Sequence, residues 1–166
     1  YKIWRARSFY SAVDQKGYTM IEDDLSRTFH DLYEAWGSAI ANKRHDWLEG
    51  FFTDDFLGTA QPWPTLVVNK DQMIELDKNI EKMDTNWVHV VAHDLGDKVV
   101  TLGLGKYNNE EFTPGSTVAD GMPSGEDISS LTKGKTVAYI NGWRHNGERW
   151  QVFDHHMVGL VDDWKD

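Results

Sequence analysis

The chain has 166 residues and a mass of 19.1 kDa, enough for one domain with its own core and too little for two ordinary domains. It has no cysteine, which excludes a disulfide scaffold, a thiolate nucleophile and a Cys-rich zinc finger. The net charge of −10 repels phosphate backbones, so we expect no nucleic-acid binding. No apolar run approaches the ~20 residues needed to cross a bilayer. Residues 1–7 are basic but no apolar stretch follows, so we expect no secretory signal and a soluble, cytoplasmic protein.

The first half of the chain favours helices. Acidic residues at 22–24 begin a helix whose apolar positions recur at helical spacing: Leu25, Phe29, Leu32, Trp36, Ala39 and Ile40. A short helix over 46–52 follows, and then two short strands, 56–60 and 65–68, on either side of a turn. Asn69 caps a third helix, in which the apolar residues are Met73, Ile74, Leu76, Ile80 and Met83.

The second half favours strands. Two hairpins are predicted, one from strands 87–94 and 99–107, the other from strands 135–145 and 150–161. Residues 108–133 form a long loop, interpreted as a lid, an edge cover or disorder. The order predicts a single α+β domain over 1–166, with residues 1–22 as an N-terminal extension. Its curved antiparallel sheet wraps around the N-terminal helices and forms a cone-shaped pocket.

Two passages carry a resemblance to a known family. Residues 46–56 read DWLEGFFTDDF, and residues 146–156 read NGERWQVFDHH. With the element order, they resemble the NTF2-like superfamily of SnoaL-like, scytalone dehydratase and ketosteroid isomerase type cone folds. The match runs over roughly residues 24–160 and is more specific for fold than for function, because isomerases, dehydratases, cyclases and non-enzymatic domains share this fold.

Residues 141–147 (NGWRHNG) have the spacing of the DHFRFNG run of ketosteroid isomerase. The resemblance implies that Asn141 takes the place of the neutral acid in that enzyme's oxyanion hole. The isomerase's general base falls on Thr59 or Ala60, and its first-helix tyrosine falls near Trp36 rather than Tyr33. Neither Thr59 nor Ala60 can take a proton, which argues against steroid isomerisation by that mechanism.

The last strand offers an acid–base pair. If Asn141 faces the pocket, strand alternation also turns Asp154 and His156 inward, about 6.5–7 Å apart at Cα. A carboxylate beside an imidazole fixes its tautomer, and such pairs serve as general acids and bases in cofactor-free proton transfer. The structural alternative is a buried histidine satisfied by its neighbour.

His89 is the second candidate acid or base. It alternates with Trp87, Val91 and His93, and the inward direction of this set rests on the resemblance; the reversed orientation would leave His89 on the outer face or in a dimer contact. A metal site of His89, Asp154 and His156 is the weaker alternative, because imidazole and carboxylate suit zinc or iron. We expect no metal and no cofactor.

Aromatic residues supply the expected pocket wall, because the chain has eight Trp and seven His in 166 residues. Flat apolar rings bind to such walls by area and edge-to-face contact, although the same residues could simply fill the core. The candidate substrate-binding residues are Tyr33, Trp36, Trp63, Trp87, Tyr139, Trp143 and His145.

These residues predict a cofactor-independent lyase or isomerase for a small aromatic compound, acting through His156, Asp154, His89 and Asn141. Dehydration and retro-aldol cleavage both fit. The resemblance implies one particular cleavage, release of formaldehyde from a lignin-derived diaryl propane, because lyases of that kind share this fold. The alternatives are a non-catalytic binding or assembly domain and a polyketide-type cyclase. The resemblance also implies a homodimer formed through the exposed sheet.

Overall fold

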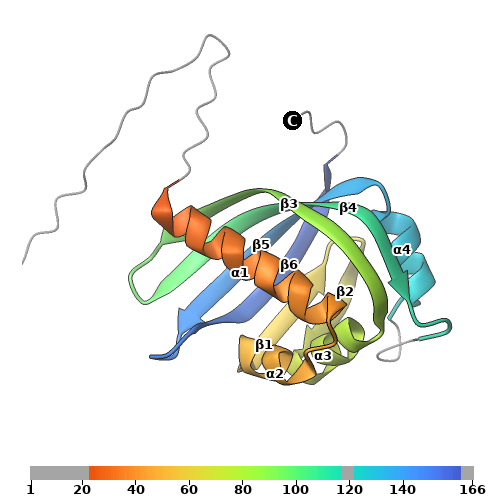
Figure 1. Cartoon of the computed structure of the whole chain (residues 1–166), viewed down its shortest axis with the longest axis horizontal. Coiled ribbons are helices and arrows are strands. Elements are labelled where there is room, and N and C mark those ends of the chain that lie inside the picture. The colour runs from red at the N-terminus through yellow and green to blue at the C-terminus, as the bar shows by residue number, and fades with distance from the viewer. Residues whose placement is uncertain (1–22, 117–121, 162–166) are drawn as a thin grey trace, which may run out of the picture.

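The computed structural model describes residues 23–116 and 122–161, so the expected extension over 1–22 lies outside the described residues. Helix α1 (Asp24–Ala41) begins at Asp23, whose side chain accepts a hydrogen bond from the backbone N–H of Ser26 at 2.7 Å. One stripe of α1 is buried, including Phe29, Tyr33 and Trp36, as the helical spacing predicts. Figure 1 shows α1 lying across one face of the sheet.

Two further helices of the first half confirm the sequence predictions closely. Helix α2 (His45–Phe51) follows α1 after a short turn. Helix α3 (Lys70–Lys78) begins with a capping box in which Asn69 and Gln72 satisfy each other's backbone N–H groups. It ends earlier than the apolar stripe suggests, because Ile80 and Met83 belong to the next strand.

The sheet has six strands in the order β2-β1-β6-β5-β4-β3 and curves without closing. The strands are β1 (Phe52–Ala60), β2 (Trp63–Asn69), β3 (Ile80–Asp94), β4 (Lys98–Phe112), β5 (Lys135–His145) and β6 (Trp150–Val161). All pairs are antiparallel except β1 and β6, which are parallel, so the sheet is mixed where a purely antiparallel one was expected. The curved sheet with helices on one face confirms the α+β cone (Figure 1).

The segment expected to be a loop, residues 108–133, contains more regular structure than its composition indicates. Strand β4 continues to Phe112, and α4 (Gly125–Thr132) begins with a capping box between Ser124 and Asp127. Helix α4 packs beside the C-terminal end of β4 and also contacts β5 (Figure 1).

Bulges break the alternation of two strands. In β3, Trp87 pairs with Gly105 and His89 pairs with Leu104, so Val88 is an extra residue. Helix α1 satisfies backbone groups freed there: His30 Nε2 lies 2.9 Å from the carbonyl oxygen of Trp87, and Glu34 accepts from the Trp87 N–H at 3.4 Å. In β6, Gly142 pairs with Asp154 and Trp143 pairs with Val152, which makes Phe153 an extra residue.

Candidate functional site

A cavity of about 130 Å³ lies between the concave face of the sheet and the helices α1, α3 and α4. Its lining is almost entirely apolar or aromatic, with methionines from α3, β3 and β6 among the wall residues. Three ionisable side chains other than tyrosine reach it: Asp77 from α3, Glu110 from β4 and His155 from β6. Because the wall is apolar, these three groups dominate the chemistry of the space.

Asp77 and Glu110 are buried acids, 4% and 5% exposed. Asp77 Oδ2 accepts a hydrogen bond from Trp36 Nε1 at 2.9 Å, and Glu110 Oε2 accepts one from Thr132 Oγ1 at 3.2 Å. Burial raises the pKa of each carboxyl to about 7, and the nearby charge of Glu110 adds to the rise for Asp77. Among the described residues neither acid has an ion-pair partner, so both exchange protons near neutral pH.

His155 is the buried histidine of the cavity, 9% exposed. Its Nδ1 lies 2.7 Å from Oδ1 of the fully buried Asn141, and its ring stacks on Tyr139 with centroids 4.9 Å apart. Burial, with the charge of His156 as a smaller cause, lowers the pKa of His155 to about 3. His155 is therefore a neutral imidazole that donates through Nδ1 and keeps Nε2 as an acceptor.

Two further tyrosines, Tyr107 and Tyr139, line the cavity. Tyr107 and Tyr139 join their hydroxyl groups in a hydrogen bond of 2.7 Å. Burial raises the pKa of both phenols above the ordinary value, and the charges of Glu110 and Asp77 raise them too. Tyr33 lies on the wall from α1 and shares a hydrogen bond of 2.9 Å with Thr101. All three tyrosines therefore remain neutral.

Most of the predicted aromatic wall is found at the cavity. Its lining includes Tyr33, Trp36, Trp63, Trp87 and Tyr139. The buried Nε1 of Trp87 has no hydrogen-bond partner, which leaves a donor that a bound molecule could satisfy. Asn141 faces inward as predicted but contacts His155 behind the wall instead of lining the cavity.

Two of the expected wall residues lie elsewhere. Trp143 is fully buried, and its ring packs against Phe29 and Phe51 at centroid distances of 5.0 and 5.7 Å, so it fills the core. Its Nε1 donates to Thr101 at 2.8 Å. His145 is exposed at the end of β5, where Nδ1 accepts from the Gly147 N–H at 3.1 Å. The prediction of pocket contact was wrong for both.

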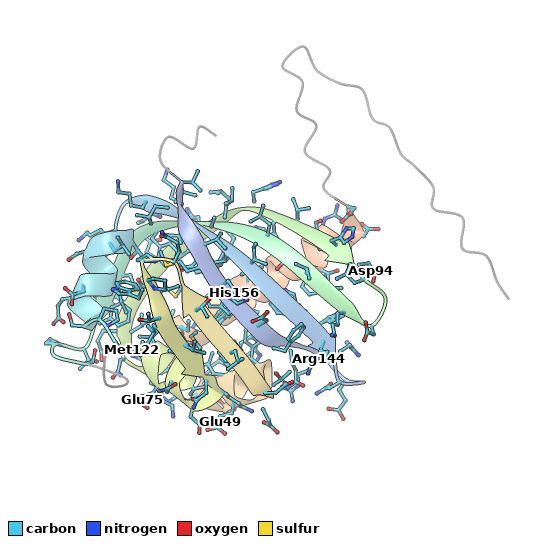
Figure 2. All side chains as sticks on the ribbon, turned by 180° about the vertical axis from the view of Figure 1, so that it is seen from behind. Glu49, Glu75, Asp94, Met122, Arg144 and His156 are labelled. Carbon is cyan, nitrogen blue, oxygen red and sulfur yellow. The ribbon has the colours of Figure 1, made fainter. Side chains whose placement is uncertain are left out.

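The predicted pair His156 and Asp154 forms, but on the outer face of the sheet. Asp154 Oδ1 lies 2.9 Å from His156 Nε2, and Thr59 Oγ1 lies 2.6 Å from His156 Nδ1, with side chains 35% (His156) and 38% (Asp154) exposed. Figure 2, seen from the side opposite to that of Figure 1, shows His156 near the middle of this face. The bulge at Phe153 is the cause, because one extra residue reverses the direction of the side chains that follow it, from Asp154 to Met157.

His89 is turned away from the cavity for the same reason. The extra residue Val88 follows Trp87, so the buried residues after the bulge are Val90 and Ala92 rather than His89. The inward orientation of His89 was therefore wrong, and its reversed alternative holds.

Sequence reasoning missed Asp77, Glu110 and His155. A signal existed for Asp77, which follows Met73 by four residues and Ile74 by three, and so shares their buried helix face. Glu110 was not predicted as a site residue because residues 108–112 were assigned to a loop. His155 was missed because regular alternation along the last strand, which the bulge at Phe153 breaks, would turn it away from the pocket.

The described residues contain no group of three histidine, aspartate or glutamate side chains that could hold a metal. The alternative metal set of His89, Asp154 and His156 is not brought together as such a group. In the same part of the chain no helix is long and apolar enough to cross a membrane.

No protein-family model and no curated protein matches the chain, but solved structures match over most of its length. An NTF2-like protein from Cytophaga hutchinsonii is 17% identical, with 81% of this chain and 97% of that chain covered and a TM-score of 0.61. A proposed calcium/calmodulin-dependent kinase II association domain from Exiguobacterium sibiricum is 7% identical, covering 87% and 98%, with a TM-score of 0.60. A proposed dehydratase of the NTF2-like family from Streptomyces avermitilis is 15% identical, covering 79% and 91%, with a TM-score of 0.53.

These similarities define the class of the fold, an α+β cone. More specifically, the chain has the NTF2-like fold, which confirms the resemblance drawn from residues 46–56 and 146–156 at the level of architecture. At such low identities the comparisons do not extend to activity.

Proposed function

We propose that the protein is a cofactor-independent lyase or isomerase that acts on a single-ring aromatic compound inside the cavity. One observation carries the proposal: two buried carboxyl groups with pKa values of about 7 face an apolar space that has no lysine or arginine in its wall. A general acid or base works best when its pKa lies near the working pH. A proposed dehydratase has the same fold, so the fold is compatible with a reaction of this class.

The two acids take different roles, one as a base and the other as an acid. Burial raises the pKa of both to about 7, and the charge of Glu110 is a further cause for Asp77, so near neutral pH one carboxyl is ionised while the other is protonated. In a dehydration, the ionised carboxylate removes the proton from a carbon next to a carbonyl. The protonated carboxyl gives its proton to the leaving hydroxyl, which departs as water while the C=C bond forms. The two acids then exchange roles for the next turnover.

The same pair supports retro-aldol cleavage. The carboxylate takes the proton of a hydroxyl group, the C–C bond breaks to form a carbonyl, and the protonated acid delivers its proton to the released carbon. In both reactions charge develops on the substrate's carbonyl oxygen, where a preorganised donor lowers the barrier. The free Nε1–H of Trp87 is a candidate for that donor. His155, neutral and held by Asn141, orients the substrate as an acceptor.

The size of the cavity favours a small substrate. A cavity of about 150 Å³ is known to hold one benzene molecule, and the volume here is about 130 Å³. The space therefore suits one ring better than the two rings of a diaryl propane. A polyketide-type cyclase, with its longer substrate, is supported less for the same reason.

Turnover of a phenyl-substituted β-hydroxy ketone tests the proposal, because dehydration and retro-aldol products are both visible by NMR. We expect Asp77→Asn with Glu110→Gln to slow turnover by at least about 100-fold. The matched control is Glu111→Gln with Asp71→Asn, two exposed neighbours that make the same charge change. Absence of turnover for single-ring β-hydroxy ketones, or unchanged turnover in the double variant, would refute the proposal.

The outer face of the sheet favours a second candidate, an assembly domain, and with it the homodimer. One cross-strand row runs over all six strands, with each residue paired to the next: Val91, Leu102, Ile140, His156, Thr59 and Val67. Four of the six are exposed apolar residues, and Leu57 and Val158 are exposed nearby. Exposed apolar patches of this kind mark contacts between proteins, so we propose that a second copy covers this face.

A further inference from the structure

The side chains of the cavity wall can carry negative charge but no positive charge. Asp77 and Glu110 are the carboxylic acids of its wall, the tyrosines and His155 are neutral, and the lining contains no lysine or arginine. Lys43 is a nearby cation, but its Nζ donates to the Ile80 carbonyl oxygen at 2.6 Å and its side chain is not part of the lining. Any positive charge within the cavity must therefore come with the ligand.

The wall also has the composition of a site for an organic cation. Rings from Trp36, Trp63, Trp87, Tyr107 and Tyr139 surround the space. The faces of such rings attract cations, and aromatic cages are a recurrent means of holding ammonium groups. Methionines of the lining add polarisable contacts for the apolar part of the ligand.

Neither acid is neutralised by the protein itself. Trp36 Nε1 and Thr132 Oγ1 donate one hydrogen bond to each acid, and both donors are neutral. Two carboxyl groups close enough for the charge of one to act on the other form a charged pair that a proton or a cation can occupy. An ammonium nitrogen fulfils that role and supplies up to three N–H donors.

We infer that the cavity binds a primary ammonium ion carried on a single aromatic ring, with the nitrogen shared by Asp77 and Glu110 and the ring against Trp36, Trp63 and Trp87. This inference rests on the proposed function only for the location of the site. It adds the class of ligand: an aromatic or arylalkyl amine in its protonated form. The net charge of −10 attracts such cations to the protein.

Three probes of nearly equal size and different charge test the inference: benzylammonium, benzyl alcohol and benzoate, titrated into the full chain by calorimetry at pH 7. We expect benzylammonium to bind at least about tenfold more tightly than benzyl alcohol, with benzoate weakest, because hydrogen bonds to charged groups are the stronger ones. In the variant Asp77→Asn with Glu110→Gln the preference for the ammonium should disappear while benzyl alcohol still binds. Retained binding of benzyl alcohol shows that the variant is folded, and Glu111→Gln is the control that keeps the preference.

The outcomes separate the inference from the proposed function. Preference for benzylammonium that depends on the two acids supports the inference, whether or not β-hydroxy ketones are turned over. Equal binding of benzylammonium and benzyl alcohol overturns the inference alone. A preference that survives in the double variant also overturns it, because the cation would then be held elsewhere. If no probe binds, the inference and the proposed pocket function both fall.

Discussion

His155 and His156 are neighbours in the chain, yet their side chains lie on opposite faces of the sheet in different environments. His155 is buried in the cavity with its Nδ1 2.7 Å from Asn141, whereas His156 is half-buried on the outer face beside Asp154 and Thr59. The bulge at Phe153 decides which of the two faces inward. The Phe153 ring lies over Gly142, at which an added Cβ would come within 2.6 Å of it.

The two histidines should therefore differ in their contribution to stability. We expect His155→Ala to lower the free energy of unfolding by about 2–4 kcal/mol, because it opens a cavity and leaves Asn141 without its partner. His156→Ala removes a half-exposed side chain with its contacts to Asp154 and Thr59, and should cost about 1 kcal/mol or less. Urea unfolding at pH 7 measures both values, and equal losses would contradict the assignment of faces.

Stability should fall as the pH rises, because of the cavity acids. Burial raises the pKa of Asp77 and Glu110 to about 7, so the folded state binds more protons than the unfolded state between about pH 4 and 7. The contribution is therefore fully present below the unfolded pKa and is lost as the pH rises through about 7. His155, with a pKa of about 3, opposes this trend below about pH 6.5 because its unfolded form takes up the proton.

The difference between wild type and Asp77→Asn isolates one acid, since asparagine can still accept from Trp36 but does not titrate. We expect the variant to gain stability relative to wild type from pH 5 to pH 8, on the order of a few kcal/mol. The measurement is urea unfolding at each pH, with the exposed Asp71→Asn as control. A difference that stays constant with pH would show that Asp77 titrates normally.

Most of the architecture could be predicted from the sequence because it depends on periodicity, whereas the parallel pairing of β1 with β6 and the helix α4 were not predicted. The stripe of α1 and the two late hairpins follow from spacing alone, and β5 and β6 have the predicted bounds. The inward orientation of Val137, Tyr139 and Asn141 also follows from regular alternation in β5.

The site was harder to predict because a single extra residue reverses a strand's faces. The bulges at Val88 and Phe153 turn His89, Asp154 and His156 outward. The side chains around the two bulges follow no pattern from which a bulge could be predicted. The prediction missed Asp77 and Glu110 for another reason. Aspartate and glutamate are almost never fully buried without a partner, so sequence reasoning assigns them to the surface by default.

The apolar row on the outer face predicts self-association. If a second copy covers this face, Ile140→Lys should produce a monomer, because a charge would be buried in the middle of the row. Light scattering after size exclusion measures the mass, and Leu95→Lys is the control, since Leu95 is also an exposed apolar residue but lies at the β3–β4 turn. A wild-type protein that is monomeric at high concentration would refute the homodimer.

Binding of an ammonium ion should release protons. At pH 7 Asp77 and Glu110 are partly protonated. A bound cation favours their ionised form, so its binding displaces these protons. The other titratable groups that face them contribute no proton at this pH: burial keeps Tyr33, Tyr107 and Tyr139 protonated, and it keeps His155 neutral. The binding enthalpy of benzylammonium should therefore differ between phosphate and Tris buffers, in proportion to their ionisation enthalpies. At pH 8 the difference should be smaller because both acids are mostly ionised there while the ligand is still an ammonium ion, and a buffer-independent enthalpy at pH 7 would mean that the acids do not contact the cation.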